Sequence, residues 1–221
     1  MKKTYNPKSF LENLLDKTLK IGVDEADAVL YENTQMSAAF RLGKKEKIFK
    51  SDTRYFSLRV IKNKSQSVVS SSNLSRESVK RTIESAISMS EATPKDPNIG
   101  LAKETEKTKK IKRTLKTYDP VIPTEKQLEE RAVTVENAAR SVKGITNSEG
   151  CMAEWEKTKT WLIGSNGFLD HYTQTKHKIF VNVLAKKGGS MERDYEYRST
   201  VFEKDLGDLK KIGISAGEKA I

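Results

Sequence analysis

The stretch 165–180, "SNGFLDHYTQTKHKIF", decides how this chain is interpreted. It contains both histidines of the sequence, His171 and His177, and two histidines close together suggest a metal ion or a general base. Its opening Ser-Asn-Gly is typical of a tight turn, and the residues after it alternate as they do in a strand that runs from solvent into a core. The stretch is therefore either a catalytic site or an ordinary hairpin.

Strand geometry argues against a shared metal ion. His171 and His177 are six residues apart, so on a strand they share a face but lie ~20 Å apart at ~3.3 Å per residue. Zinc ligands must lie ~2 Å from the ion, so the two histidines cannot bind one ion together. In a helix the same spacing would place them on different faces. The chain contains no HExxH or related motif, so we expect no metal site here.

The composition indicates a globular protein with a strong basic excess. The 221 residues carry a net charge of +11, with 36% hydrophobic and 32% charged residues, which leaves enough apolar side chains for a core. No apolar run approaches the ~20 residues of a membrane helix. The N-terminal segment reads as an amphipathic helix, because Glu12, Asp16 and Lys17 interrupt any signal-peptide core. The single cysteine, Cys151, excludes an intrachain disulfide, so we expect a cytoplasmic protein without a membrane partner.

Part of the basic excess lies in the segment 103–116, "KETEKTKKIKRTLK", which has seven basic and two acidic residues. Such a run is usually a solvated connector. It could also bind nucleic acid non-specifically through its charge. No basic stripe interleaved with aromatic residues accompanies it, so the connector is favoured over nucleic-acid binding.

Helix and strand signals alternate in the first half of the chain. Residues 9–22 predict a helix opened by a capping box from Ser9 to Glu12, and residues 75–92 predict a helix capped by Ser75. Between them the pattern indicates two or three strands with a turn at 43–44, then a hairpin that turns at 62–64.

The pattern restarts after the basic segment. A capping box from Thr124 to Gln127 predicts a helix of about 124–142. Residues 144–202 then indicate four strands with turns near 156–157, 165–167 and 187–189, and a last helix starts near Asp205. We therefore expect the α+β class, with antiparallel or mixed sheets of hairpins flanked by helices. The two similar halves would be 1–102 and 123–221, joined by a basic linker at 103–122.

The segment 191–197, "MERDYEY", is the densest mixture of charged and aromatic residues. On a strand its arginine and tyrosines would face one way and its three acids the other. Paired acids can do acid–base work or bind metal, but a solvated face that pairs with lysines is the simpler interpretation. For Cys151 the two interpretations are a nucleophile beside a histidine and an inert, partly buried thiol, and the second is preferred.

Three segments in order resemble the TldD/PmbA family and, within it, the PmbA branch: "ITNSEG" (145–150), "SNGFLDHYTQTKH" (165–177) and "MERDYEY" (191–197). The hairpin at 51–75 fits less well, since bulky residues such as Tyr55 and Phe56 replace glycines usual in the family. The resemblance implies the N-terminal domain of a longer protein with a further β-rich domain.

The same resemblance implies a function in cytoplasmic peptide processing, in a family also called modulators of DNA gyrase. Its TldD branch carries an HExxxH zinc motif, whereas the PmbA branch lacks it and pairs with the TldD subunit. No zinc ligand or catalytic glutamate can be carried over to this chain, so zinc is expected only in a TldD-type partner. A peptide or unfolded polypeptide would be the substrate, and a homo-oligomer is a further option.

Three hypotheses follow. The first is a non-zinc subunit that presents peptide and contacts its partner, through these candidate residues: Asn166, Gly167, His171, Glu192, Arg193 and Asp194. The second is a nucleic-acid-associated module that uses 103–116. The third is a hydrolase that uses Cys151 and a histidine.

Overall fold

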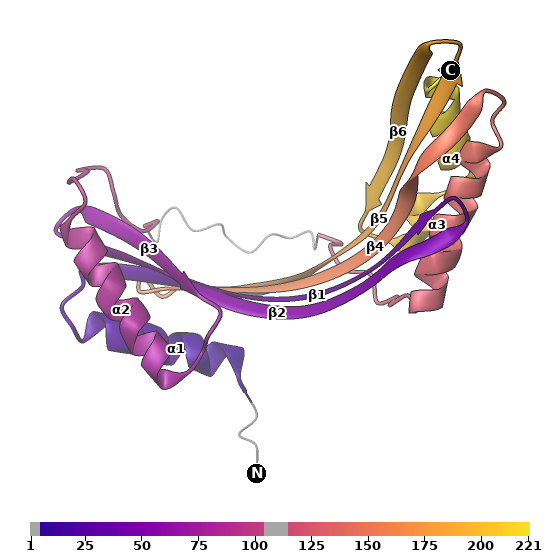
Figure 1. Ribbon diagram of the computed structural model, residues 1–221. Helices are drawn as coiled ribbons and strands as arrows, with labels where there is room; N and C mark the ends of the chain where they lie inside the picture. The colour runs from indigo at the N-terminus through magenta and orange to yellow at the C-terminus, as the bar shows by residue number, and fades with distance from the viewer. Residues whose placement is uncertain (1–4, 104–114) are drawn as a thin grey trace. The chain divides into compact units, whose positions relative to one another are not determined.

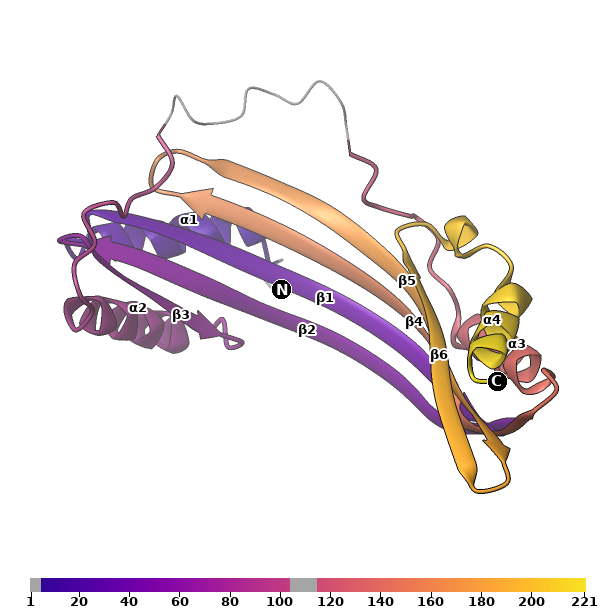
Figure 2. The ribbon, with the colours of Figure 1, turned by 90° about the horizontal axis from the view of Figure 1, so that it is seen from above.

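A computed structural model describes residues 5–103 and 115–221 and has the α+β architecture that the sequence predicts. Six antiparallel strands form one sheet in the order β3-β2-β1-β4-β5-β6 (Figures 1 and 2). Along the chain the elements are α1 (Pro7–Leu19), β1 (Glu25–Arg41), β2 (Lys44–Lys62), β3 (Ser65–Ser71), α2 (Arg76–Glu91), α3 (Glu125–Arg140), β4 (Ile145–Gly164), β5 (Leu169–Lys187), β6 (Ser190–Thr200), the 3-10 helix η2 (Glu203–Leu206) and α4 (Leu209–Lys219).

The chain divides into two compact units that are interleaved in the sequence. Unit 1 contains the described parts of Met1–Glu32, Thr53–Leu115 and Lys159–Tyr172, and unit 2 contains Asn33–Asp52, the described part of Lys116–Thr158, and Thr173–Ile221. The interleaving arises because β1, β2, β4 and β5 are 17 to 20 residues long and each contributes to both units. Most of the basic segment 103–116 lies outside the described residues.

In unit 1, α1 and α2 bury their apolar stripes against one face of the sheet. Leu11 and Leu14 of α1 and Ile83 of α2 meet strand residues such as Phe56 in one core. Ser75 caps α2 as predicted. The predicted capping box at Ser9 is wrong, because α1 begins earlier, at Pro7, with the Asn6 side chain accepting a hydrogen bond from the Ser9 amide.

In unit 2, α3 and α4 cover the sheet over a second core that includes Val135, Trp155, Ile179 and Ile212. The predicted capping box is confirmed, since the Thr124 and Gln127 side chains bond each other's backbone amides.

Two predictions for the second half need correction. No turn occurs near 156–157, so this half has three strands and not four. The polar residues there lie inside β4 and bond neighbouring strands, as Glu156 does with Lys178 and Thr158 with Asn33. The last helix also starts later than predicted, because Gly207 (φ 71°) separates η2 from α4, which Asp208 caps.

The described residues include no helix long and apolar enough to cross a membrane.

Candidate functional site

β6 is an edge strand and carries two of the most exposed aromatic side chains among the described residues, Tyr195 and Tyr197. It pairs antiparallel with β5 along its whole length, from Ser190–Lys187 to Thr200–His177. Among residues 5–103 and 115–221 it has no strand on its other side. An edge strand of this kind presents unpaired backbone groups that another chain can bind.

Tyr195 and Tyr197 turn their backbone amides to this free edge. Each amide donates to the carboxylate of the preceding residue, Tyr195 to Asp194 at 2.7 Å and Tyr197 to Glu196 at 3.1 Å. In an antiparallel ladder, alternate residues bond the neighbouring strand and the others point away from it. These two amides are therefore the outward ones, and a pairing chain would have to displace the two carboxylates.

The aromatic rings lie on the sheet face away from α4. The register places Tyr197 beside Phe180 and Tyr195 beside Asn182, and the ring centroids of Phe180 and Tyr195 are 5.7 Å apart. Tyr197 is 62% exposed and Tyr195 is 51% exposed. Exposed tyrosines next to a free strand edge can bind an extended peptide through both backbone and side chains.

The side chains of the predicted cluster 191–197 lie on two faces. Arg193 lies on the aromatic face, 3.4 Å from the Glu149 carboxylate. Glu196 lies on the α4 face, where it accepts hydrogen bonds from Lys219 at 2.8 Å and Ser215 at 2.7 Å. The bonds from Lys219 and Ser215 hold the pKa of Glu196 below its usual value. We call the surface formed by the free side of β6 and the side chains of Phe180, Arg193, Tyr195 and Tyr197 the β6 edge.

Next to these rings, Lys178 bridges two acids of β4. Its ammonium lies 2.5 Å from Glu154 and 3.4 Å from Glu156, and Gln35 also donates to Glu154. Burial alone would lower the pKa of Lys178, but the hydrogen bonds and charges of the two carboxylates outweigh it and raise the pKa. Lys178 therefore stays charged and holds β5 to β4.

His177 lies on the opposite face of β5 and is fully buried. Its Nε2 atom lies 3.4 Å from Asp119, which also accepts the amides of Val121 and Glu203. Arg131 forms an ion pair with Glu203 at 2.5 Å. Burial and the nearby Arg131 charge lower the pKa of His177, so its imidazole is neutral at pH 7. This cluster joins β5 to α3 and η2 and is closed to a substrate.

The candidates at the β4–β5 turn have structural partners in unit 1. The Asn166 side chain donates to the Ala102 carbonyl at 2.9 Å, and Gly167 has the positive φ of 80° that the turn requires. His171 stacks on Trp161, with ring centroids 6.2 Å apart and 13° between the planes.

The six candidate residues are thus divided between the units: Asn166, Gly167 and His171 belong to unit 1, and Glu192, Arg193 and Asp194 belong to unit 2. Phe180, Tyr195 and Tyr197 were not among the candidates. The alternation of side chains along β6 was the signal that could have found the two tyrosines, whereas Phe180 joins them only through strand pairing.

Cys151 lies in the core of unit 2 and is 2% exposed. Burial is the main cause that raises the pKa of its thiol, and the neighbouring Glu136 charge adds to the effect. A buried neutral thiol is a poor nucleophile, which favours the inert interpretation of Cys151 over the hydrolase hypothesis.

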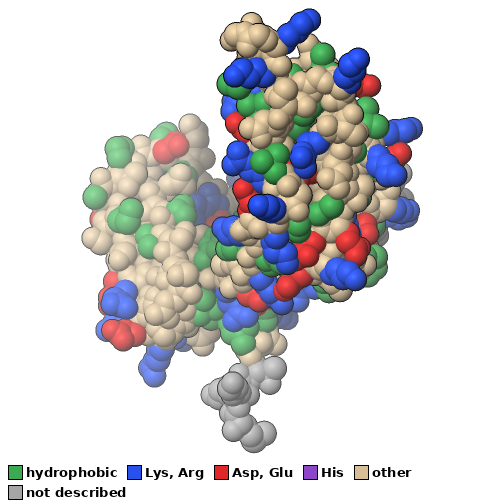
Figure 3. Space-filling model, turned by 45° about the vertical axis from the view of Figure 1, so that its right-hand side comes forward, with side chains coloured by type: hydrophobic (Ala, Val, Ile, Leu, Met, Phe, Trp, Pro, Cys, Tyr) green, Lys and Arg blue, Asp and Glu red, His purple; other side chains and the backbone are tan. Residues whose placement is uncertain are grey.

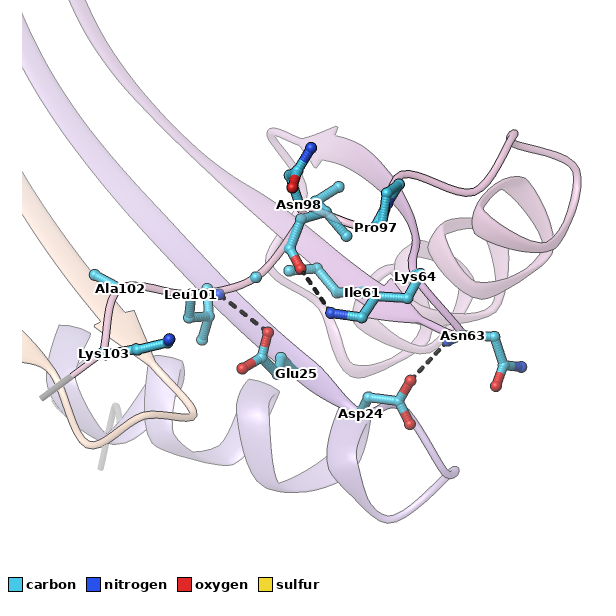
Figure 4. Close-up of a pocket in the computed structure, with 12 residues that line it drawn as sticks. Asp24, Glu25, Ile61, Asn63, Lys64, Pro97, Asn98, Leu101, Ala102 and Lys103 are labelled. Carbon is cyan, nitrogen blue, oxygen red and sulfur yellow. Dashed lines mark hydrogen bonds between the residues drawn. The ribbon is translucent and has the colours of Figure 1, made fainter.

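A cavity of about 810 Å³ lies in unit 1 beneath residues 97–103 (Figure 4). Its polar groups bond one another: Asp24 accepts the Asn63 amide at 2.6 Å, and Glu25 accepts the Leu101 amide at 3.0 Å. These carboxylates fix the covering segment to the start of β1 and to the β2–β3 turn.

Over the part of the chain that the structure describes, no three His, Cys, Asp or Glu side chains gather in a way that could hold a metal ion. The family resemblance assigns no zinc ligand to this chain, and we derive no chemical step through a metal.

Comparison with known proteins gives a consistent assignment. Residues 26–90 match the family described as PmbA/TldA metallopeptidase domain 1, and residues 94–221 match the PmbA/TldA metallopeptidase central domain. The chain is 26% identical over 199 residues to the metalloprotease PmbA of Escherichia coli O157:H7, covering 90% of this chain and 44% of that protein.

Solved structures show the same fold. A candidate modulator of DNA gyrase from Bacteroides thetaiotaomicron superposes with a TM-score of 0.89 at 22% identity, covering 98% of this chain and 50% of that one. TldE from Thermococcus kodakarensis gives a TM-score of 0.79 at 18% identity, covering 96% and 47%. The chain spans about half the length of these relatives. Because the central-domain match alone covers more than half of the sequence, this chain belongs to the PmbA/TldD family of metallopeptidase-related proteins.

Proposed function

We propose that this chain is the N-terminal part of a non-zinc subunit in a cytoplasmic peptide-processing complex, where it presents peptide and contacts a TldD-type zinc subunit. The β6 edge is the observation that carries this proposal. It combines outward backbone amides at Tyr195 and Tyr197 with exposed rings on one face. An extended substrate would add a strand to β6, and its side chains would pack on the tyrosines.

The two edge amides differ in how firmly their carboxylate acceptors are held in place. Glu196 is held in place by Lys219 and Ser215 while its other oxygen accepts the Tyr197 amide. The side chain of Asp194 accepts only the Tyr195 amide among the hydrogen bonds of the described residues. A peptide would therefore displace Asp194 first, so binding would begin at Tyr195.

The experiment measures the affinity of the full-length protein for a fluorescein-labelled unstructured peptide. Asp194→Ala should tighten binding because it frees the Tyr195 amide. Tyr195→Ala with Tyr197→Ala should weaken binding by roughly tenfold, since each lost aromatic contact removes on the order of 0.5–1 kcal/mol. The matched control is Tyr55→Ala with Tyr172→Ala, which removes two exposed tyrosines from unit 1. Equal weakening by both pairs would contradict binding at the β6 edge.

The nucleic-acid alternative is not favoured. On the face seen in Figure 3, Lys and Arg side chains are interspersed with Asp and Glu and do not form a continuous stripe. A nucleic-acid surface on this face would be expected to show such a stripe along the phosphates, and most of 103–116, the segment that the alternative uses, lies outside the described residues.

A further inference from the structure

A groove of about 570 Å³ in unit 1 lies between the C-terminal end of α1 and the first turns of α2. It is lined by Lys17, Lys20, Ile21, Arg76, Glu77, Lys80, Ile83 and Glu84, and it shares no residue with the β6 edge. The residues from α2 span about two helical turns, or ~12 Å along the axis. A groove of this length matches about two turns of a partner helix.

The bottom of the groove is apolar. Ile21 is 55% exposed although it is a large aliphatic residue, whereas Ile83, which also lines the groove, belongs to the core of unit 1 and is 2% exposed. The aliphatic stems of the lysines extend this apolar surface. Phosphate groups would not cover it, which argues against nucleic acid as the occupant.

The rim of the groove carries more positive than negative charge. Four cations line it against two carboxylates, and the Lys80–Glu84 pair is long and exposed at 3.7 Å. Within residues 5–103 and 115–221, Lys17, Lys20 and Arg76 have no carboxylate within ion-pair distance. The α1 dipole favours Lys17 near its C-terminus, but Arg76 stands at the first position of α2, where the dipole disfavours a cation. An external anionic group would account for Arg76.

We infer that this groove binds an acidic amphipathic helix of a partner protein, with its apolar stripe on Ile21 and the aliphatic stems of the lysines and its carboxylates facing the four cations. Both walls of the groove are helices, so a partner helix would pack its side chains against theirs, as in helix-in-groove recognition. The net charge of +11 opposes a second copy of this chain as the occupant.

The probe is a labelled synthetic helix of about 16 residues with leucines along one stripe and glutamates beside it. A peptide of the same composition without the stripe is its control. Fluorescence anisotropy with the full chain should show saturable binding of the striped peptide, and binding at least about tenfold weaker for the scrambled one.

Protein variants locate the site. Lys20→Glu with Lys80→Glu should weaken binding by about tenfold or more, whereas Lys126→Glu with Lys143→Glu, the same charge change on exposed residues of unit 2, should alter it by less than about threefold. Ile21→Ser should weaken binding, while Val68→Ser, at a position equally 55% exposed, should not. Circular dichroism melting verifies that each variant is folded.

Equal losses from the two double variants would show bulk charge attraction and overturn the inference, as would equal affinity for the scrambled peptide or no saturable binding. A dimer in size-exclusion chromatography that Ile21→Ser dissociates would overturn it in favour of a second copy. Peptide presentation at the β6 edge is unaffected by any of these results, because Tyr195 and Tyr197 stay unchanged.

Discussion

At the scale of single residues, the two histidines of the stretch 165–180 illustrate how burial separates chemically identical side chains. His171 stacks on Trp161 at the surface of unit 1, whereas His177 is fully buried beside Asp119 in unit 2. The strand spacing of the two histidines excluded a shared metal ion. It did not identify the cluster around His177, because Asp119, Arg131 and Glu203 come from distant parts of the chain.

His177 should make stability depend on pH. Its folded pKa lies below the usual 6.5, so as pH falls below 6.5 the unfolded chain takes up a proton that the folded protein does not. The free energy of unfolding should therefore fall from about pH 7.5 to about pH 5.5, by at most about 1.4 kcal/mol per pH unit. The carboxyl pKa values of Asp119 and Glu196 are also lowered, so these groups lose their contribution to the free energy of unfolding only in a separate, more acidic range, as pH falls below 3.8 and 4.5.

Urea unfolding at the two pH values measures this dependence. His177→Gln should flatten it, and His171→Gln, which removes the exposed histidine, is the matched control and should keep the wild-type dependence. An unchanged slope in His177→Gln would show that the pH dependence comes from other groups.

Cys151 should be unreactive in the native protein. Burial raises the pKa of its thiol and blocks access to it, so a thiol reagent should modify the chain slowly in buffer and fully in guanidinium chloride. Mass spectrometry follows the modification. Rapid native labelling would contradict the buried position, and loss of peptide-processing activity in Cys151→Ala, with an unchanged melting temperature, would revive the hydrolase hypothesis.

At the scale of elements, α3 and α4 pack closely through glycine. A Cβ atom at Gly213 would overlap the Val135 carbonyl and lie 2.8 Å from Ala138 Cβ. Gly213→Ala should therefore destabilise the protein by roughly 1–3 kcal/mol, although alanine favours helix formation. Gly189→Ala in the β5–β6 turn is the control, since no atom lies within 4 Å of its added Cβ. Thermal unfolding compares the two, and equal stability would contradict the close packing of the helices.

Local signals predicted most elements and failed where pairing is long-range. The Ser75 cap and the Thr124–Gln127 capping box depend on neighbours in the sequence, and both are confirmed. The turn expected at 156–157 was inferred from polarity alone. The polar side chain of Glu156 does not mark a turn but pairs with Lys178 of β5. The spacing within β4 cannot reveal a partner on another strand. The β6 edge was missed in part for the same reason, because Phe180 joins it only through its pairing with Tyr197.

At the scale of the whole molecule, one sheet joins elements from both halves of the sequence. β1 lies between β2 and β4, so the central pairing links residues more than a hundred positions apart. Family membership is shown by matches along nearly the whole chain, while the relatives are about twice as long. The role of the complete protein as a non-zinc subunit is therefore a proposal that experiment must test.

The most direct test mixes the full-length protein with a TldD-type zinc subunit and follows both by size-exclusion chromatography, with an unstructured peptide added to the collected peak. The proposed role predicts that the two proteins co-elute as one complex and that this complex cleaves the peptide. The full-length protein alone, with Tyr195 and Tyr197 intact, should not cleave it. Separate elution of the two proteins, or full cleavage by the zinc subunit alone, would contradict it.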